Sequence, residues 1–218
     1  MRVIATFEKG PSVRFVGHLD TLRTLQRALR RSGLPVRYSV GFNPHMVLAF
    51  ASALSVGVAS TGEVMDIALA QDVTEEEFLL RLAPQMPPGF VLKHARAVPD
   101  GYAKLMNLVS EANYRVALSR ARIKCIDLQA ALAQPLMAEK RGKAGTKEVD
   151  LREWVQAIDT DEGQPSTLSM RLACRETGAL NPRLLMPALL ARLSIEDEYS
   201  VCRTGLTSGG KFLWEAGA

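Results

Sequence analysis

The most informative hydrophobic pattern in the chain is a leucine repeat at helical spacing between Leu19 and Ser32. The leucines of this repeat are Leu19, Leu22, Leu25 and Leu29. Arginines occupy the opposite side of the same predicted helix, and they are Arg23, Arg27, Arg30 and Arg31. Gly17 before the helix and Gly33 after it are residues typical of helix ends. The pattern therefore predicts an amphipathic helix with one buried leucine stripe and one arginine face.

The segments around this helix predict a β-α-β-β-α-β order for the first half of the chain. Alternating residues predict strands over 2–7 and 62–70, and a further strand over 90–97. Extended segments over 36–39 and 46–53 flank a turn formed by residues 41–45. Thr74 begins a short acidic helix that Pro84 ends. This order is the ferredoxin-like pattern.

The second half of the chain repeats this order after a linker over residues 99–110. Strands or extended segments are expected over 113–120, 148–151, 166–174 and 195–204, and helices over 126–133 and 181–193. We therefore expect an α+β protein with two ferredoxin-like (βαββαβ) lobes in tandem, over residues 1–98 and 111–218.

The net charge of +4 conceals an uneven distribution of charged side chains. Residues 1–50 carry net +6 and residues 51–100 net −4, while residues 101–158 carry net +4 and residues 159–218 net −2. A basic segment followed by an acidic one thus occurs in each predicted lobe. Basic faces of this kind favour polyanions, RNA above all, or acidic protein surfaces.

Cysteine usage and hydropathy indicate the compartment. Cys125, Cys174 and Cys202 are widely spaced and form no CxxC pair, which favours reduced thiols. No apolar run approaches the ~20 residues of a membrane span, and the N-terminus lacks the apolar core of a signal peptide. We expect a cytoplasmic protein without a membrane partner.

Two basic segments are candidates for contact with nucleic acid. The arginine face has no acidic partners at i,i+4 spacing, and arginine matches phosphate geometry. A basic loop over residues 139–147 would contribute Lys140, Arg141, Lys143 and Lys147. The alternative for both segments is an ordinary solvated surface.

Two histidines flank the arginine helix, and the turn Gly41–His45 is built to place a side chain. His45 is the first candidate for a general base and His18 the second, and His18 is expected to be buried near the leucine side of the helix. Asp20 can instead bond the free backbone N–H groups of the first helical turn. Residues expected to shape one pocket are His18, Asp20, Ser39, Phe42, Asn43 and His45.

Several chemistries lack their sequence motifs. The GxxxxGK[ST] spacing of a phosphate-binding loop and the GxSxG elbow are absent, as is metal-ligand spacing of the zinc type. We therefore expect no resident metal and no cofactor, and we favour a chain without catalytic activity of its own over an enzyme.

Residues 10–67 resemble the bacterial radical-SAM-linked protein family, whose function is uncharacterised. The resemblance is specific over residues 11–66 and looser elsewhere. It rests on Gly17-His18-Leu19-Asp20, Arg30-Arg31, Ser39, Gly41 to His45, Leu54, Gly57, Ser60, Gly62-Glu63 and Asp66, with Lys147 to Arg152 and Arg203-Thr204 farther on. The chain departs from the family pattern at Met46-Val47, where a proline and a basic residue are expected.

The resemblance implies an accessory module that works with a cobalamin-binding-type radical SAM protein, in RNA modification or another process related to translation. The chain lacks the CxxxCxxC triplet, so it is not itself the radical SAM catalyst. Two alternatives remain open. One is an RNA-processing endonuclease with twin ferredoxin-like lobes, and the other is a protein-docking subunit without RNA binding.

Overall fold

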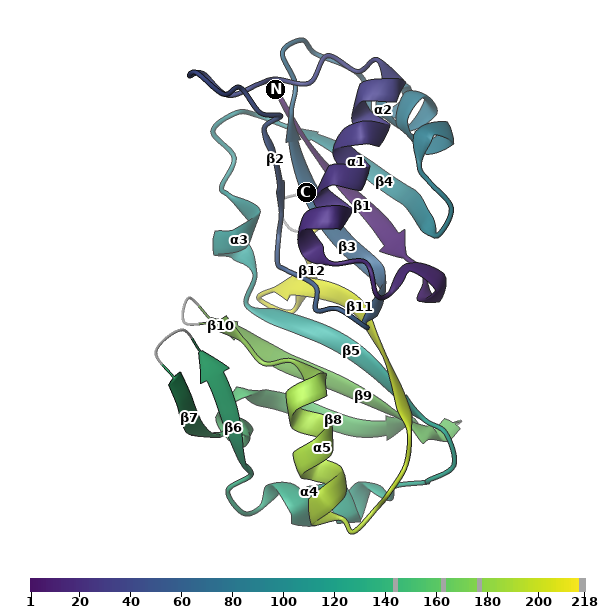
Figure 1. Ribbon diagram of the computed structural model, residues 1–218, viewed down its shortest axis with the longest axis vertical. Helices are drawn as coiled ribbons and strands as arrows, with labels where there is room; N and C mark the ends of the chain where they lie inside the picture. The colour runs from purple at the N-terminus through teal and green to yellow at the C-terminus, as the bar shows by residue number, and fades with distance from the viewer. Residues whose placement is uncertain (143–144, 162–163, 176–177, 216–218) are drawn as a thin grey trace. The chain divides into compact units, whose positions relative to one another are not determined.

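A computed structural model describes residues 1–142, 145–161, 164–175 and 178–215 of the chain (Figure 1). The protein is α+β, as the sequence predicts. It divides into two compact units: Met1–Val109 together with residues from Gly205 onward, and Ser110–Thr204. The predicted second lobe runs to residue 218, whereas the chain from Gly205 onward groups with the first unit.

The first unit has the predicted β-α-β-β-α-β order. Its elements are β1 (Arg2–Lys9), α1 (His18–Ser32), β2 (Leu48–Phe50), β3 (Ala59–Ala68), α2 (Glu75–Leu82) and β4 (Phe90–Val98). Three short helices, η1 (Pro11–Val13), η2 (Ala83–Gln85) and α3 (Leu105–Leu108), complete it. Strand β1 pairs antiparallel with β3 and β4, and β2 pairs antiparallel with β3. The register places Lys9 opposite Ser60 at one end of β3 and Arg2 opposite Ala68 at the other.

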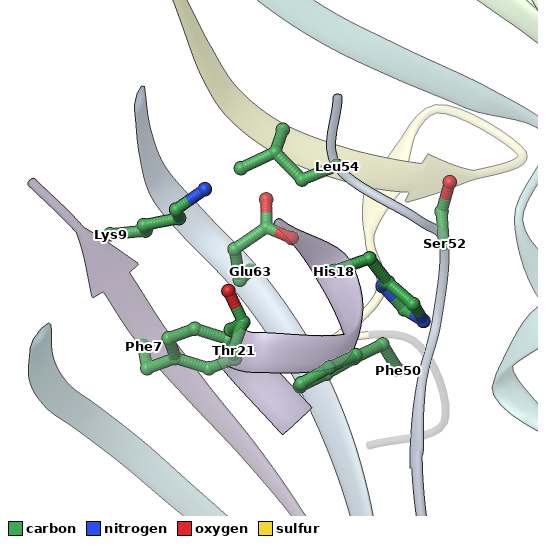
Figure 2. A pocket seen from close by; sticks show the side chains of 8 residues that line it. All are labelled: Phe7, Lys9, His18, Thr21, Phe50, Ser52, Leu54 and Glu63. Atoms are coloured by element: carbon green, nitrogen blue, oxygen red, sulfur yellow. The ribbon is translucent and has the colours of Figure 1, made fainter. Parts of the chain in front are cut away.

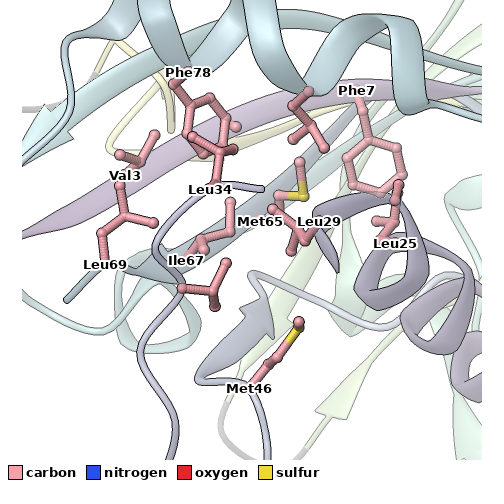
Figure 3. Close-up of a cluster of buried hydrophobic side chains, with 14 of the residues drawn as sticks. Val3, Phe7, Leu25, Leu29, Leu34, Met46, Met65, Ile67, Leu69 and Phe78 are labelled. Atoms are coloured by element: carbon pink, nitrogen blue, oxygen red, sulfur yellow. The ribbon is translucent and has the colours of Figure 1, made fainter. Parts of the chain in front are cut away.

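Helices α1 and α2 contribute to the core on one face of this sheet (Figure 3). Leu25 and Leu29 are buried as predicted, and Thr21 and Ala28 are buried beside them. Leu22 is half-buried. Leu19 is 62% exposed, so its predicted burial is wrong. It precedes Leu25 by six residues, which at ~100° per residue turns its side chain ~120° away from the buried stripe.

The opposite face of the sheet carries polar residues that other segments of the first unit cover. Arg2 pairs with Asp66 and donates to the carbonyl of Tyr102. The ring of Trp214 stacks on His94 with centroids 4.8 Å apart, and the adjacent Leu213 is fully buried. Strand β12 (Lys211–Phe212) pairs with the end of β11 (Tyr199–Ser208), which brings the chain back into the first unit.

The second unit contains more strands than a ferredoxin-like lobe. Its elements are β5 (Glu111–Leu118), α4 (Cys125–Leu132), β6 (Met137–Gly142), β7 (Gly145–Asp150), η3 (Leu151–Trp154), β8 (Val155–Asp161), β9 (Gln164–Arg175), β10 (Gly178–Ala179), α5 (Pro182–Arg192) and the first part of β11. Strand β9 pairs with β5, β8 and β10. Strands β6 and β7 pair only with each other in the described ladders. The structure therefore does not confirm two ferredoxin-like lobes in tandem.

One prediction for the second unit is wrong, and one of its strands was missed. The basic segment 139–147 is not a loop, because most of it lies in the hairpin formed by β6 and β7. Strand β8 was not predicted at all. Residues 139–142 and 145–148 include no large apolar residue, so this part of the sequence lacks the alternation by which a strand is recognised. The predicted linker contains α3, whose Leu105 is buried.

Candidate functional site

The arginine face of α1 is exposed along the whole helix, but its four side chains differ in their partners. Arg23 pairs at 3.0 Å with Asp20, which precedes it by three residues, so one arginine of the face has an acidic partner although none lies at i,i+4 spacing. Arg31 donates to the carbonyl of Gln85 at 2.6 Å. Among the described residues, the guanidiniums of Arg27 and Arg30 have no hydrogen-bond or ion-pair partner. Two guanidiniums of the face are therefore available to a ligand.

The carbonyl end of α1 is capped by a side chain from α2. Gly33 adopts the left-handed conformation (φ 65°) that ends the helix. Arg81 donates to the carbonyls of Ser32, at 3.2 Å, and of Gly33, and it also pairs with Glu77. A cation at a helix C-terminus stabilises the helix dipole. Because Arg81 occupies this position, Arg30 is not engaged in capping.

A small pocket lies beside the first turn of α1 (Figure 2). Its lining residues are Phe7, Lys9, His18, Thr21, Phe50, Ser52, Leu54 and Glu63. Lys9 and Glu63 are only 2% and 4% exposed. The Lys9 ammonium donates to the carbonyls of Val16 at 2.6 Å and of Arg14 at 3.3 Å. This buried lysine therefore fastens the turn between β1 and α1 to the sheet.

The pocket is too small for a nucleotide in this conformation. The enclosed cavity has a volume of only about 10 Å³. That space is room for about one water. The ring of His18 packs edge-on against Phe50, with centroids 5.2 Å apart. His18 is exposed rather than buried as predicted, because the helix begins with it.

The pocket around Lys9 and Glu63 was not predicted, although the sequence carries a signal for it. Lys9 continues the period-two pattern of Val3, Ala5 and Phe7, the residues of β1 that belong to the core cluster beneath the helices. Glu63 likewise precedes Met65 and Ile67 on the buried side of β3. A charged residue that continues a buried alternation is an indication of a satisfied buried charge.

The turn between α1 and β2 is held by its own polar groups. The Nδ1 atom of His45 lies 2.8 Å from the Ser39 hydroxyl, which also accepts from the His45 backbone N–H at 3.1 Å. The Ser39 backbone N–H donates to the carbonyl of His45 at 2.8 Å, and Tyr38 forms a β-bridge with Met46. Phe42 and Asn43 are exposed on the turn enclosed by these bonds.

The six residues predicted to shape one pocket do not come together. His18 lines the pocket at the Ser60 end of β3. Ser39, Phe42, Asn43 and His45 lie beyond the other end of the strand, where Val36 bridges Leu69. The ten residues of β3 separate these ends by about 30 Å. Asp20 bonds Arg23 on the surface instead of a backbone N–H.

His45, the first catalytic candidate, contacts a hydroxyl as a general base would. Its role in holding the turn accounts for that contact, since the same hydroxyl bonds the His45 backbone. Within the described parts of the chain, no carboxylate bonds the imidazole of His45 to orient it. A catalytic role for His45, or for His18, stays a prediction.

The basic hairpin of the second unit is described only in part. Lys147 is exposed on β7, and the register places it opposite Lys140 of β6. The side chains of Lys140 and Arg141, and the whole of Lys143, lie outside the described residues. Asp150 closes the base of the hairpin by accepting from the backbone N–H groups of Leu136 and Arg152, each at 3.0 Å. Together with the Arg152 guanidinium, which acts most strongly, these bonds lower the pKa of Asp150 to about 2.

In residues 1–142, 145–161, 164–175 and 178–215, no three histidine, cysteine or acidic side chains gather as metal ligands would. No helix of the same residues is both long and apolar enough to cross a bilayer.

Comparison with known proteins places the chain in a family. No curated protein matches it. The model of a family described as an uncharacterized protein conserved in bacteria (DUF2344) matches residues 2–182, which is most of the chain. The protein therefore belongs to this bacterial family, DUF2344.

Proposed function

We propose that the protein is an accessory RNA-binding module and that Arg27 and Arg30 of α1 hold RNA phosphates. The observation that carries this proposal is that both guanidiniums are exposed and have no partner among the described residues. Arg23 and Arg31 flank them at the start and end of the face, where each already bonds a neighbour. The unpaired pair is thus the centre of the proposed phosphate contact.

The physical chemistry of the helix supports a ligand role over a structural one. A solvated helix face ordinarily mixes charges of both signs at i,i+4 spacing. Capping of the helix end does not require Arg30, because Arg81 performs it. Guanidinium groups bind phosphate oxygens through paired N–H donors, and this favours phosphate as the ligand.

The finer proposal is that the module works with a cobalamin-binding-type radical SAM enzyme in the cytoplasm, in RNA modification or a related process. Its support is the sequence resemblance over residues 11–66. Cys125, Cys174 and Cys202 are free thiols, which agrees with a reducing compartment. The partner enzyme would supply the iron–sulfur cluster and the chemistry.

Salt-dependent RNA binding tests the proposal. The affinity of the full chain for a labelled single-stranded RNA would be measured between 50 and 300 mM salt, with the R27E/R30E double variant beside it. Each lost phosphate contact lowers the salt slope by about 0.7, so the double variant should lose about 1.4 of slope. Its affinity should fall about a hundredfold or more, because two hydrogen bonds to charged groups are lost and each contributes about 1.5–3 kcal/mol.

A matched control is the R122E/K124E variant, since both residues are exposed in the second unit and the net charge changes equally. Equal losses in the two variants would show a non-specific charge effect and contradict the proposal. No RNA binding by the unmodified protein would also contradict it. Loss of a co-purifying protein from the R27E/R30E variant, with RNA affinity unchanged, would assign the arginine face to protein docking instead.

A further inference from the structure

The segment Val40–Pro44, which we call the loop tip, exposes apolar side chains to an unusual extent. Val40 and Phe42 are fully exposed, and no residue of the tip carries a charge. A phenylalanine ring left in water forgoes the favourable free energy of its burial. Folded proteins compensate such a loss when a partner covers the ring.

The loop tip is rigidly supported at its base. The bonds between Ser39 and His45 close the turn, and the bridge between Tyr38 and Met46 continues it toward the sheet. The backbone of Arg37 bonds Val47 and Ala68, and its guanidinium pairs with Asp100. Gly41 supplies the positive φ of 137° that the turn requires. A ring presented by a fastened turn loses little conformational freedom on binding.

We propose that Phe42 stacks on an unpaired base, so that the module's substrate is single-stranded nucleic acid. This inference rests on the proposed function, in which Arg27 and Arg30 hold the phosphates. Phosphate contacts fix the position of a strand without distinguishing single from double strands or reading bases. An exposed aromatic ring adds that distinction, because only an unpaired base can leave the helical stack and lie on it.

The dimensions of the loop tip favour a base over a protein surface as its occupant. A stable protein–protein interface covers about 800 Å² on each partner. A fully covered aromatic side chain accounts for about 150–250 Å², so the tip supplies only a fraction of that area. One stacked base needs only a single aromatic ring.

The path of the chain connects the two parts of this site. Arg30 lies in the last turn of α1, and the loop tip follows it within the same unit. Figure 1 shows the segment between α1 and β2 projecting on the left at the top of the first unit, where α1 ends on the right. A single strand that contacts both the arginine face and the loop tip would therefore cross this end of the unit.

The test uses the full chain, a labelled single-stranded RNA and a blunt duplex of the same sequence. Phe42→Leu keeps an apolar side chain but removes the aromatic face, and Phe42→Trp keeps it. We expect Phe42→Leu to weaken single-strand binding about tenfold and to leave duplex binding and the salt slope unchanged. Phe42→Trp should bind the single strand with the affinity of the unmodified protein. Phe15→Leu is the control, because Phe15 is also exposed but lies under the Arg14 guanidinium before α1.

The outcomes separate this inference from the proposed function. Unchanged binding by Phe42→Leu, with weaker binding by R27E/R30E, would overturn the stacking and leave the phosphate site. An equal loss of single-strand and duplex affinity in Phe42→Leu would also overturn it. Failure of both variants to change binding would overturn both proposals. Loss of a co-purifying protein from Phe42→Leu, with RNA affinity intact, would give the loop tip a protein partner.

Discussion

The two ends of strand β3 reverse the usual distribution of charged and apolar side chains. At the Ser60 end, Lys9 and Glu63 are almost completely buried. Beyond the Ala68 end, Val40 and Phe42 are fully exposed. A buried charge persists where the fold satisfies it, whereas an exposed ring persists where a partner covers it. The first end is therefore expected to govern stability and the second to govern binding.

The largest effect is expected from Lys9→Ala. Removing the ammonium leaves the carbonyls of Arg14 and Val16 without its hydrogen bonds and keeps the Glu63 carboxyl buried without this nearby cation. We expect the free energy of unfolding in urea to fall by about 3 kcal/mol. Lys93→Ala is the control, because Lys93 pairs with Glu8 on the surface and should cost less than about 1 kcal/mol. Equal losses of unfolding free energy in the two variants would contradict the expectation that the buried lysine contributes more to stability than the exposed one.

An intermediate effect is expected from Ser39→Ala at the other end. The variant removes the hydroxyl that bonds both the ring and the backbone N–H of His45. We expect a loss of about 1 kcal/mol that is confined to the turn. Amide hydrogen exchange would detect it as faster exchange at His45 with unchanged rates in β1 and β3. Ser39→Thr retains a hydroxyl and should restore the slow exchange.

A smaller effect on stability is expected from Phe42→Ala. The ring is fully exposed, so its removal should change the free energy of unfolding by less than about 0.5 kcal/mol. Thermal unfolding of Phe42→Ala beside the unmodified protein measures this change in stability. A clear destabilisation would mean that the ring is packed in solution, and it would remove the contrast between the two ends.

The smallest effect concerns the ion pair at the base of the loop tip. The Arg37 guanidinium, through its hydrogen bond, holds the pKa of Asp100 below its ordinary value of 3.8. Because the pKa of Asp100 is lower in the folded protein than in the unfolded chain, its carboxylate stabilises the fold above about pH 3.8. This contribution is lost as the pH falls through the lower, folded-state pKa. Melting curves between pH 6 and pH 3 should therefore decline slightly less for Asp100→Asn. An identical decline would show that the pair adds nothing in solution.

The arrangement of the first unit was predictable where local chemistry and periodicity agree. Thr74 caps helix α2 as predicted, since its side chain accepts from the Glu77 backbone N–H. Leu25 marks the core face of α1, but Leu19 satisfies a three-to-four spacing from Leu22 without reaching that face. Spacing between neighbouring leucines accumulates angular error along a helix, and only the tertiary contacts show which turn the core covers.

The candidate site was less predictable than the fold. The arginine face follows from helix geometry, but the pairing of Arg23 with Asp20 depends on rotamers that a helical wheel does not contain. The predicted pocket of six residues, which included the two histidines flanking the helix, does not form because His18 and His45 lie at opposite ends of β3. Residues that flank the same helix in the sequence can therefore lie far apart in the structure, because the helix itself spans about 22 Å.

The discontinuity of the first unit has a consequence for synthesis. Leu213 and Trp214 pack in that unit, yet the whole of Ser110–Thr204 is translated before them. A ribosome therefore releases β1 to β4 long before the residues that stack on His94 exist. Completion of the first unit must wait for closure of a long chain loop, which is a slow, non-local step. A fragment cut at Val109 would be an unfinished folding unit rather than an independent domain.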